Sequence, residues 1–325
     1  MNVRYLTGFE STNAAVLVAT DGTVRLFTDF RYAERARELE GVEFEETKRY
    51  IYSDLAERLP EPIAFEADAL TYANWELLRA GGVGLVPRRG LIESLRAVKD
   101  GEELDSIRRA TEVTNRTYER LAEEPFAGRT EKDLAWRMEQ LFHEEGADGL
   151  AFPIDIASGP TAASPHAVSG DRVVQEGDLV IVDAGAVVDG YCSDCTRTFA
   201  VGEVSDSLRE TYEVVLEGQQ AGLDAIRAGV SGRDADTEAR AVIADAGYGE
   251  NFGHGLGHGV GLLVHEAPVL RPESEDILAV GNVVTVEPGI YLSGVAGVRI
   301  EDLVVVTEDG RDVLTSFPKD LISVR

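Results

Sequence analysis

The sequence predicts an α+β protein, in which a small N-terminal α/β domain precedes a larger domain that contains an internal duplication. Two observations lead to this prediction. Strand-like and helix-like segments alternate over the first 95 residues, and one pattern of helices and strands occurs twice in the remainder. A chain of 325 residues is long enough to form two domains and to bury a sizeable core. We therefore expect domains at residues 1–95 and 96–325.

The N-terminal segment has the turn signals and apolar runs of a small α/β domain. Residues 14–29, AAVLVATDGTVRLFTD, predict two strands around a turn at Asp21 and Gly22. Residues 30–40 then predict a helix. Further along we expect a strand, a helix, and a last strand with a connector, at residues 62–70, 71–80 and 82–104.

The rest of the chain holds two copies of one pattern, which we take as an internal repeat. The segment AGRTEKDLAWRMEQLFHEEGADG begins at residue 127 and matches AGVSGRDADTEARAVIADAGYGE, which begins 101 residues later. Each follows a helical segment, and each starts with a helix-capping signature. The strand-like GDLVIVDAG at 177–185 matches GNVVTVEPG at 281–289, at the similar offset of 104 residues. Chance similarity of short apolar strands is the alternative explanation.

Carboxylates stand at matching places in the two copies. Asp183 ends the apolar run LVIVD and Glu287 ends VVTVE, and Asp194 and Glu301 follow them on further strand-like segments. Turns between adjacent strands would bring Asp183 beside Asp194 and Glu287 beside Glu301. Four carboxylates cannot share a site without cations, so the set predicts a pair of divalent metal ions. For any one of them alone, a capped or salt-bridged carboxylate is the ordinary explanation.

Three of the five histidines, His254, His258 and His265, lie within HGLGHGVGLLVH. Histidines at positions i and i+4 could bind one metal ion from a helix, but the interspersed glycines disfavour a helix. We expect this stretch to add an imidazole to the carboxylates rather than to form a zinc site by itself. An oxygen-rich donor set favours manganese, with cobalt, zinc or iron as alternatives.

These motifs resemble the proline peptidases of the pita-bread superfamily, which are the prolidases (Xaa-Pro dipeptidases) and aminopeptidase P. The motifs are SPHAV, VDAGAVVDGYCSDCTRTFAVG, GHGLGHGVGLLVHEAP, TVEPGIY and GVRIEDLVVVTEDG, which follow the family's order over about residues 100–325. Residues 5–32 resemble the creatinase-type N-terminal domain of the family. The resemblance implies a pita-bread catalytic domain. The family usually has a helix and a strand before YLTGF, whereas this sequence begins only four residues before that motif. We therefore expect either a trimmed N-terminal domain or a start that is set wrongly.

The resemblance implies a role for each site residue. The implied ligands of the two metal ions are Asp183, Asp194, His258, Glu287 and Glu301. Of these, Asp194 and Glu301 would contact both ions, and Glu287 would also transfer a proton. The implied catalytic histidines are His254, at the developing oxyanion, and His166 and His265, at the proline end of the substrate. Tyr291 and Arg299 would stand beside the site.

The implied activity is two-metal hydrolysis of the peptide bond before proline by a metal-bridging hydroxide. The substrate would be a proline-containing peptide, and the resemblance leads us to expect a homodimer. Fold and metal ions do not dictate the substrate, so a small-molecule hydrolase or lyase on the same scaffold is the alternative. A metal-free hydrolase or a non-enzymatic binding module would be expected to lack ligands, whereas all five positions are filled here.

The composition is strongly acidic, with 31 basic and 59 acidic residues and a net charge of −28. Such a field repels nucleic acid and anionic membranes, so we expect neither as a partner. We interpret the charge as a hydrated surface suited to high salt, as in halophiles. An acidic surface for a partner is the alternative. There is no apolar run that could span a bilayer and no signal-peptide pattern, so we expect a cytoplasmic protein.

Cys192 and Cys195 form a C-x-x-C pattern, which in other contexts indicates a redox or zinc site. Positions i and i+3 of a strand face opposite sides of a sheet. We therefore expect that the two thiols share neither a metal ion nor a disulfide.

Overall fold

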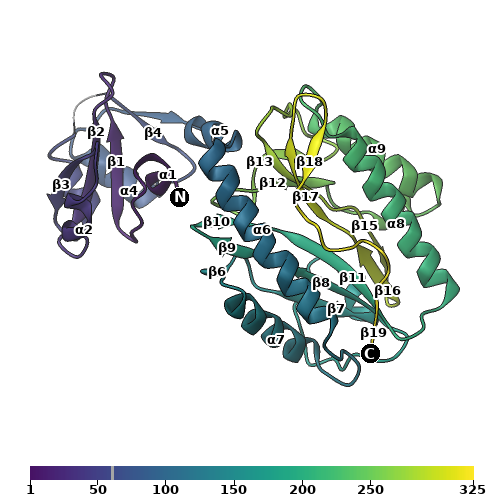
Figure 1. Cartoon of the computed structure of the whole chain (residues 1–325). Coiled ribbons are helices and arrows are strands. Elements are labelled where there is room, and N and C mark those ends of the chain that lie inside the picture. Colours follow the sequence, from purple (N-terminus) through teal and green to yellow (C-terminus); the bar gives the residue numbers. More distant parts are fainter. Residues whose placement is uncertain (60–61) are drawn as a thin grey trace. The chain divides into compact units, whose positions relative to one another are not determined.

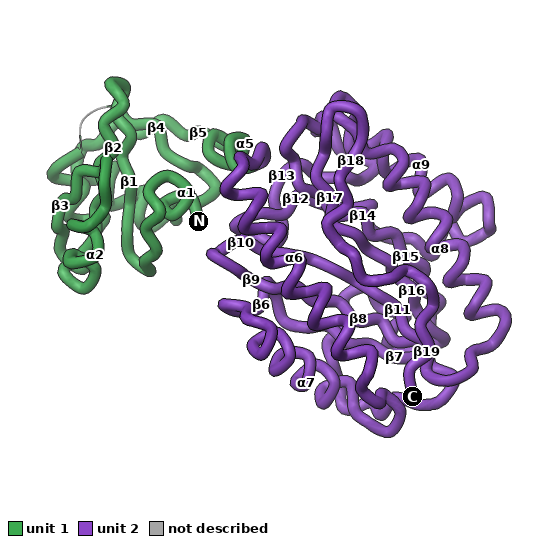
Figure 2. Tube along the Cα trace, in the orientation of Figure 1, with its two compact units in different colours: residues 1–96 green, residues 97–325 purple. Residues whose placement is uncertain are grey.

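The computed structural model describes residues 1–59 and 62–325, and its chain divides into two compact units, residues 1–96 and 97–325 (Figure 2). Both units combine helices with β-sheet, so the α+β class predicted from the sequence is confirmed. Within the described residues, no helix is long and apolar enough to cross a membrane.

Unit 1 holds a sheet in the order β1-β2-β3 and a separate parallel pair, β4 and β5. The turn between β1 and β2 contains Gly22, whose φ of 89° suits glycine because it has no Cβ. The strands are β1 (Ala14–Val18), β2 (Val24–Asp29), β3 (Glu43–Thr47), β4 (Ile63–Glu66) and β5 (Leu85–Arg88). The helices are α1 (Asn2–Thr7), α2 (Ala33–Arg37), α3 (Ile51–Leu55), α4 (Tyr72–Ala80) and α5 (Leu91–Ala97).

The first half of unit 2 consists of two helices followed by a sheet. Its sheet has the order β19-β11-β8-β7, in which β8 pairs antiparallel with both of its neighbours. A hairpin of β9 and β10 connects β8 to β11. The elements are α6 (Gly101–Ala122), α7 (Glu131–Glu144), β6 (Gly149–Leu150), β7 (Asp155–Ser158), the 3-10 helix η1 (Gly159–Ala163), β8 (Leu179–Ala184), β9 (Ala186–Val188), β10 (Tyr191–Cys192) and β11 (Cys195–Val201), together with the C-terminal β19 (Ser323–Val324).

The second half of unit 2 repeats this arrangement. Its sheet has the order β13-β12-β14-β17-β18, and the hairpin of β15 and β16 connects β14 to β17 as β9 and β10 connect β8 to β11. The duplication predicted from the sequence is therefore present. The elements are α8 (Asp206–Ala225), α9 (Gly232–Asp245), the 3-10 helix η2 (Gly249–Asn251), β12 (Gly257–Gly259), β13 (Glu266–Leu270), β14 (Val283–Val286), β15 (Gly289–Leu292), β16 (Ala296–Arg299), β17 (Asp302–Val306) and β18 (Arg311–Val313).

The strands of unit 2 lie between the two helix pairs, with α6 and α7 along the first half and α8 and α9 along the second (Figure 1). In the first half, Leu134 and Phe142 of α7 pack in one cluster with Val182 of β8. In the second, Ala239 of α9 packs with Val286 of β14. Because side chains alternate along a strand, the residues that follow Val182 and Val286 face away from these helices.

Candidate metal centre

The register of the strands explains why the acidic residues meet. Asp183 on β8 lies opposite Thr196 on β11, and Asp194 comes two residues before Thr196, so both carboxylates belong to one face. In the other half, Val286 lies opposite Asp302, which places the adjoining residues Glu287 and Glu301 opposite each other. Each half therefore contributes one pair of carboxylates, as expected from the repeat.

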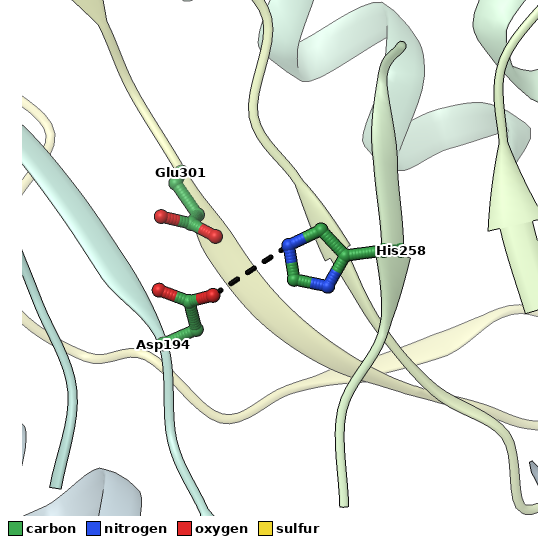
Figure 3. A group of neighbouring side chains, drawn as sticks. All are labelled: Asp194, His258 and Glu301. Carbon is green, nitrogen blue, oxygen red and sulfur yellow. Dashed lines mark ion pairs between the residues drawn. The ribbon is translucent and has the colours of Figure 1, made fainter. Parts of the chain in front are cut away.

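The two halves join at Thr196, and this junction brings the pairs together. The backbone N–H of Glu301 donates to the Thr196 carbonyl at 3.1 Å, and the Thr196 hydroxyl donates to Glu301 Oε2 at 2.8 Å. Asp194, Glu301 and His258 point toward one another, and one ligand atom from each lies within 4.8 Å of the others (Figure 3). His258 Nε2 lies 3.6 Å from Asp194 Oδ2 and 3.2 Å from Glu287 Oε1.

His258 is held by β12 in an orientation that directs Nε2 at the carboxylates. Its Nδ1 lies 3.1 Å from the Gly259 carbonyl, and because a carbonyl can only accept, Nδ1 carries a proton. The segment is a strand rather than a helix. A Cβ at Gly257 would lie 2.1 Å from the Thr285 carbonyl oxygen, and one at Gly259 would lie 2.3 Å from that of Ala267. The glycines thus let β12 approach its neighbours closely.

The charges of the cluster are unbalanced. Burial raises the pKa of Asp194 and of Glu301 well above the usual range, and the neighbouring carboxylates raise both further. Burial also raises the pKa of Asp183, although the Arg299 guanidinium at 2.6 Å opposes it. Burial acts in the same direction on Glu287, but the hydrogen bond with His258 outweighs it and lowers the pKa of Glu287 to about 2.

Metal binding fits this donor set. Two buried oxygens of the cluster, Asp183 Oδ1 and Glu301 Oε1, have no hydrogen-bond partner within the part of the chain that the structure describes. A buried polar atom without a partner costs a few kcal/mol, and a buried charge costs more unless a cation or a metal ion compensates it. Burial lowers the pKa of His258, but the contact with Glu287 outweighs burial and raises the pKa overall.

Arg299 joins the carboxylates to an aromatic residue. Its Nη2 donates to Asp183 Oδ2 at 2.6 Å, its Nε donates to the Thr196 hydroxyl at 3.0 Å, and its Nη1 donates to the Tyr291 hydroxyl at 2.9 Å. Tyr291 and Arg299 are both buried. The structure thus places Arg299 in contact with a predicted ligand and Tyr291 in contact with Arg299.

His254 lies next in this chain of hydrogen bonds. Its Nδ1 lies 2.8 Å from the Gly255 carbonyl, so Nδ1 carries a proton, and its Nε2 lies 2.9 Å from the Tyr291 hydroxyl. Burial lowers the pKa of His254, which keeps the ring neutral, and the Tyr291 hydroxyl therefore donates to Nε2. For His254 to donate to a substrate oxygen, either its Nδ1–H must leave the Gly255 carbonyl, or the ring proton must move to Nε2 and the bond from Tyr291 must open.

The other two predicted histidines lie at the edge of the cluster. The His265 ring is 4.3 Å from the His258 ring, measured between centroids, and His265 is exposed. Partial burial lowers the pKa of His265, and the nearby His258 and His166 lower it further. His166 is exposed in the segment after η1. All of the predicted site residues are therefore in or near one region of unit 2.

Several residues that the sequence did not single out hold the site in place. Thr285 accepts from the His258 backbone N–H at 3.1 Å and donates to Glu287 Oε1 at 3.0 Å, a role like that of Thr196 beside Glu301. Each threonine stands two residues from a predicted ligand, and the period of two along a strand was the signal that could have identified it.

Two charged residues of α9 support the segment that carries His254. Arg240 donates to the carbonyls of Phe252 and His254 at 2.8 and 2.7 Å, and Asp236 accepts from the Leu256 N–H at 3.0 Å. Their spacing in the sequence indicates only an ion pair along a helix. Asp155, opposite Asp183 on β7, was also missed. Burial and the Asp183 charge raise its pKa to about 6.

The two cysteines are free and buried. Cys192 packs in one hydrophobic cluster with Val260 and Leu303, and Cys195 packs in another with Phe199. The strand expected through both is interrupted, because β10 ends at Cys192 and β11 begins at Cys195. Both thiols, which we expected not to share a disulfide, are free in the structure.

We expect neither cysteine to react with a thiol reagent while the protein is folded. Burial raises the pKa of Cys192 to about 12 and raises that of Cys195 as well. The thiolate fraction at pH 8 should therefore be about a thousandfold below that of a free cysteine. Titration with Ellman's reagent should detect two thiols only after denaturation. Rapid release of one equivalent by the native protein would contradict this expectation.

Comparison with known proteins covers both units. The model of "Metallopeptidase family M24" matches residues 105–308, and that of the "Creatinase/Prolidase N-terminal domain" matches residues 1–98. The chain is 40% identical over 329 residues to the uncharacterized peptidase YqhT of Bacillus subtilis. This alignment covers 99% of this chain and 93% of that protein.

Solved structures agree with the family matches. A Xaa-Pro dipeptidase from Bacillus anthracis has a TM-score of 0.95 and 39% identity, covering 99% of this chain and 92% of that one. An X-Pro aminopeptidase from Thermotoga maritima has a TM-score of 0.92 and 36% identity, covering 99% and 93%. The fold and the acidic centre define a metal-dependent hydrolase of peptide bonds. The chain belongs to metallopeptidase family M24, which confirms the resemblance seen in its motifs.

Proposed function

We propose that this metallopeptidase hydrolyses the peptide bond before proline, in Xaa-Pro dipeptides or at the start of longer Xaa-Pro peptides. The observation that carries the proposal is the convergence of four carboxylates with His258, beside further histidines. The relatives named as a Xaa-Pro dipeptidase and an X-Pro aminopeptidase support it, because the chain covers almost the whole of both.

The residues that would hold two divalent metal ions are Asp183, Asp194, His258, Glu287 and Glu301. The oxygen-rich set favours manganese over cobalt, zinc or iron. When bound, the ions would lower the pKa of a water molecule between them and polarise the carbonyl group of the scissile bond.

Side chains of the protein would carry out the proton transfers and orient the substrate. A bond to proline leaves a ring nitrogen that needs a proton, and Glu287 would take a proton from water and deliver it to that nitrogen. His254 would donate to the developing oxyanion once its Nδ1–H has left the Gly255 carbonyl, or once the ring proton has moved to Nε2 and the bond from Tyr291 has opened. His166 and His265 would orient the proline end of the substrate. Arg299 would keep Asp183 ionised and hold Tyr291 in place.

A peptidase assay tests the proposal. Release of the residue before proline is measured for a Xaa-Pro dipeptide and for a longer Xaa-Pro peptide, with manganese and with a chelator. Peptides with alanine in place of proline serve as controls. We expect cleavage only of proline substrates and only with metal. Cleavage of one proline substrate but not the other would decide between dipeptidase and aminopeptidase. No cleavage of either would refute the proposal and favour a small-molecule substrate.

We also propose that the charge of −28 adapts the protein to high salt. Salt screens the repulsion between acidic residues, and this repulsion destabilises the folded chain more than the expanded one. The thermal midpoint should rise by about 5 °C or more between low salt and molar potassium chloride. Calorimetry across this range checks the expectation, and a midpoint that does not change would contradict it.

The expected homodimer remains a proposal drawn from the family resemblance. Light scattering coupled to size-exclusion chromatography should give a mass twice that of the chain.

A further inference from the structure

The segment of residues 159–170, which we name the His166 loop, lies against the metal centre. The carbonyl of Pro165 accepts from Arg299 Nη1 at 3.2 Å, and the same guanidinium binds Asp183. The loop packs so closely on β16 that a Cβ at Gly297 would lie 1.9 Å from the Ala162 carbonyl oxygen. The conformation of this loop therefore determines where His166 stands relative to the carboxylates.

One buried carboxylate is bound to both ends of the His166 loop. Glu131, the first residue of α7, is 1% exposed. Its Oε1 accepts from the backbone N–H and the hydroxyl of Ser158 at 2.8 and 2.7 Å, and also from the hydroxyl of Thr161. Its Oε2 accepts from the N–H of Gly170 at 3.0 Å. A single side chain thus connects the residue before the loop with the residue that ends it.

The donors to Glu131 are neutral groups, and they are themselves held in place. The Ser158 hydroxyl also accepts from Arg172, which binds both oxygens of Asp178 at 2.6 and 3.0 Å. The backbone N–H of Glu131 donates to the Arg172 carbonyl at 3.1 Å. A buried carboxylate is costly unless several donors satisfy it, and the N-terminus of a helix of this length favours a negative charge. The arrangement is therefore a rigid anchor for the loop.

We propose that Glu131 is a positioning residue for the reaction. It holds the His166 loop in the one conformation that presents His166 to the substrate and Pro165 to Arg299. The inference rests on the proposed function, in which His166 orients the proline end of the substrate. Glu131 itself does not touch the substrate, so its effect on catalysis passes through the loop.

Replacing Glu131 with glutamine removes part of the anchor but keeps the size of the side chain. An amide has one acceptor oxygen, and its NH₂ group must face donors at one of the two ends of the loop. Glu131→Gln therefore releases either Gly170 or Ser158. Asp133→Asn is the matched control, because Asp133 lies in the same first turn of α7, is exposed, and caps the helix by accepting from the Thr130 N–H.

Kinetics of the metal-loaded enzyme on a Xaa-Pro substrate test the positioning role. Glu131→Gln should raise KM about tenfold or more and change kcat less, whereas Asp133→Asn should leave both unchanged. Combining Glu131→Gln with His166→Ala should be no worse than His166→Ala alone, because both act through one residue. Additive losses in the double variant, or an unchanged KM in Glu131→Gln, would overturn the proposal.

Hydrogen exchange tests the anchor without any assumption about substrate. In Glu131→Gln the amide of Ser158 or that of Gly170 should exchange faster than in the wild type and in Asp133→Asn, with bound metal unchanged. Equal protection at both amides would overturn the anchor even if no Xaa-Pro peptide is cleaved. If Glu131→Gln fails to fold, Thr161→Val removes one donor to Oε1. It should shift KM and exchange in the same direction by less, and wild-type values of both would refute the proposal.

Discussion

Replacing Glu287 with glutamine is expected to lower kcat/KM on a Xaa-Pro substrate by about 10²- to 10⁴-fold, the usual contribution of a general acid–base group. The glutamine keeps the size of the side chain but cannot take a proton from water or pass one to the proline nitrogen. Steady-state kinetics should be measured together with the number of bound metal ions, because the same carboxylate is a predicted ligand.

Glu103→Gln is a suitable control for this variant. Glu103 is also a buried glutamate of unit 2, but it caps α6 and accepts from the Tyr191 hydroxyl, away from the carboxylate cluster. The Glu103→Gln variant shows how far kcat/KM falls when any buried glutamate of unit 2 is neutralised. Full activity of Glu287→Gln with both metal ions bound would refute the proton-transfer role, whereas lost metal would indicate that the residue acts mainly as a ligand.

Removal of the metal ions is expected to abolish hydrolysis and to make stability fall as pH rises. In the metal-free protein, burial and mutual repulsion raise the pKa values of Asp183, Asp194 and Glu301 above those of the unfolded chain. The folded state therefore binds these protons more tightly. The stability that this tighter proton binding contributes is complete below the unfolded carboxyl pKa of about 4. It is lost as pH rises through the raised pKa values of the folded state. Glu287 has the opposite sign, but its lowered pKa confines its effect to acidic pH.

Thermal unfolding from pH 5 to pH 8, with a chelator and with manganese, measures this effect. Surface carboxylates are already ionised over this range, so they add little to the slope. The midpoint of the chelated protein should decrease with pH, and manganese should restore it. Asp194→Asn removes one of the buried charges and should flatten the slope in the chelator. A chelated midpoint that rises with pH, or that manganese does not change, would contradict the expectation.

Much of the fold follows from local patterns in the sequence. Hydroxyl caps begin α7 and α9 at Thr130 and Ser231, and the apolar periodicity of the helices that follow matches the faces that they bury. The strand break at Ser193 and Asp194 was not predicted, because neither position is a glycine or proline that would mark one. What interrupts β10 and β11 is the closing of the hairpin onto neighbouring strands, which a single segment does not record.

The sequence by itself determined that this protein is duplicated and that each copy supplies a pair of carboxylates. This was possible because strand alternation and the repeat constrain residues that are near in sequence or equivalent between copies. Only the tertiary structure decided how those pairs meet at Thr196 and which ring nitrogen of His254 carries the proton. It also decided that Glu131 and Arg240 anchor the segments that carry His166 and His254. Such contacts join residues far apart in the chain, and their donors and acceptors are common residue types whose partners depend on packing.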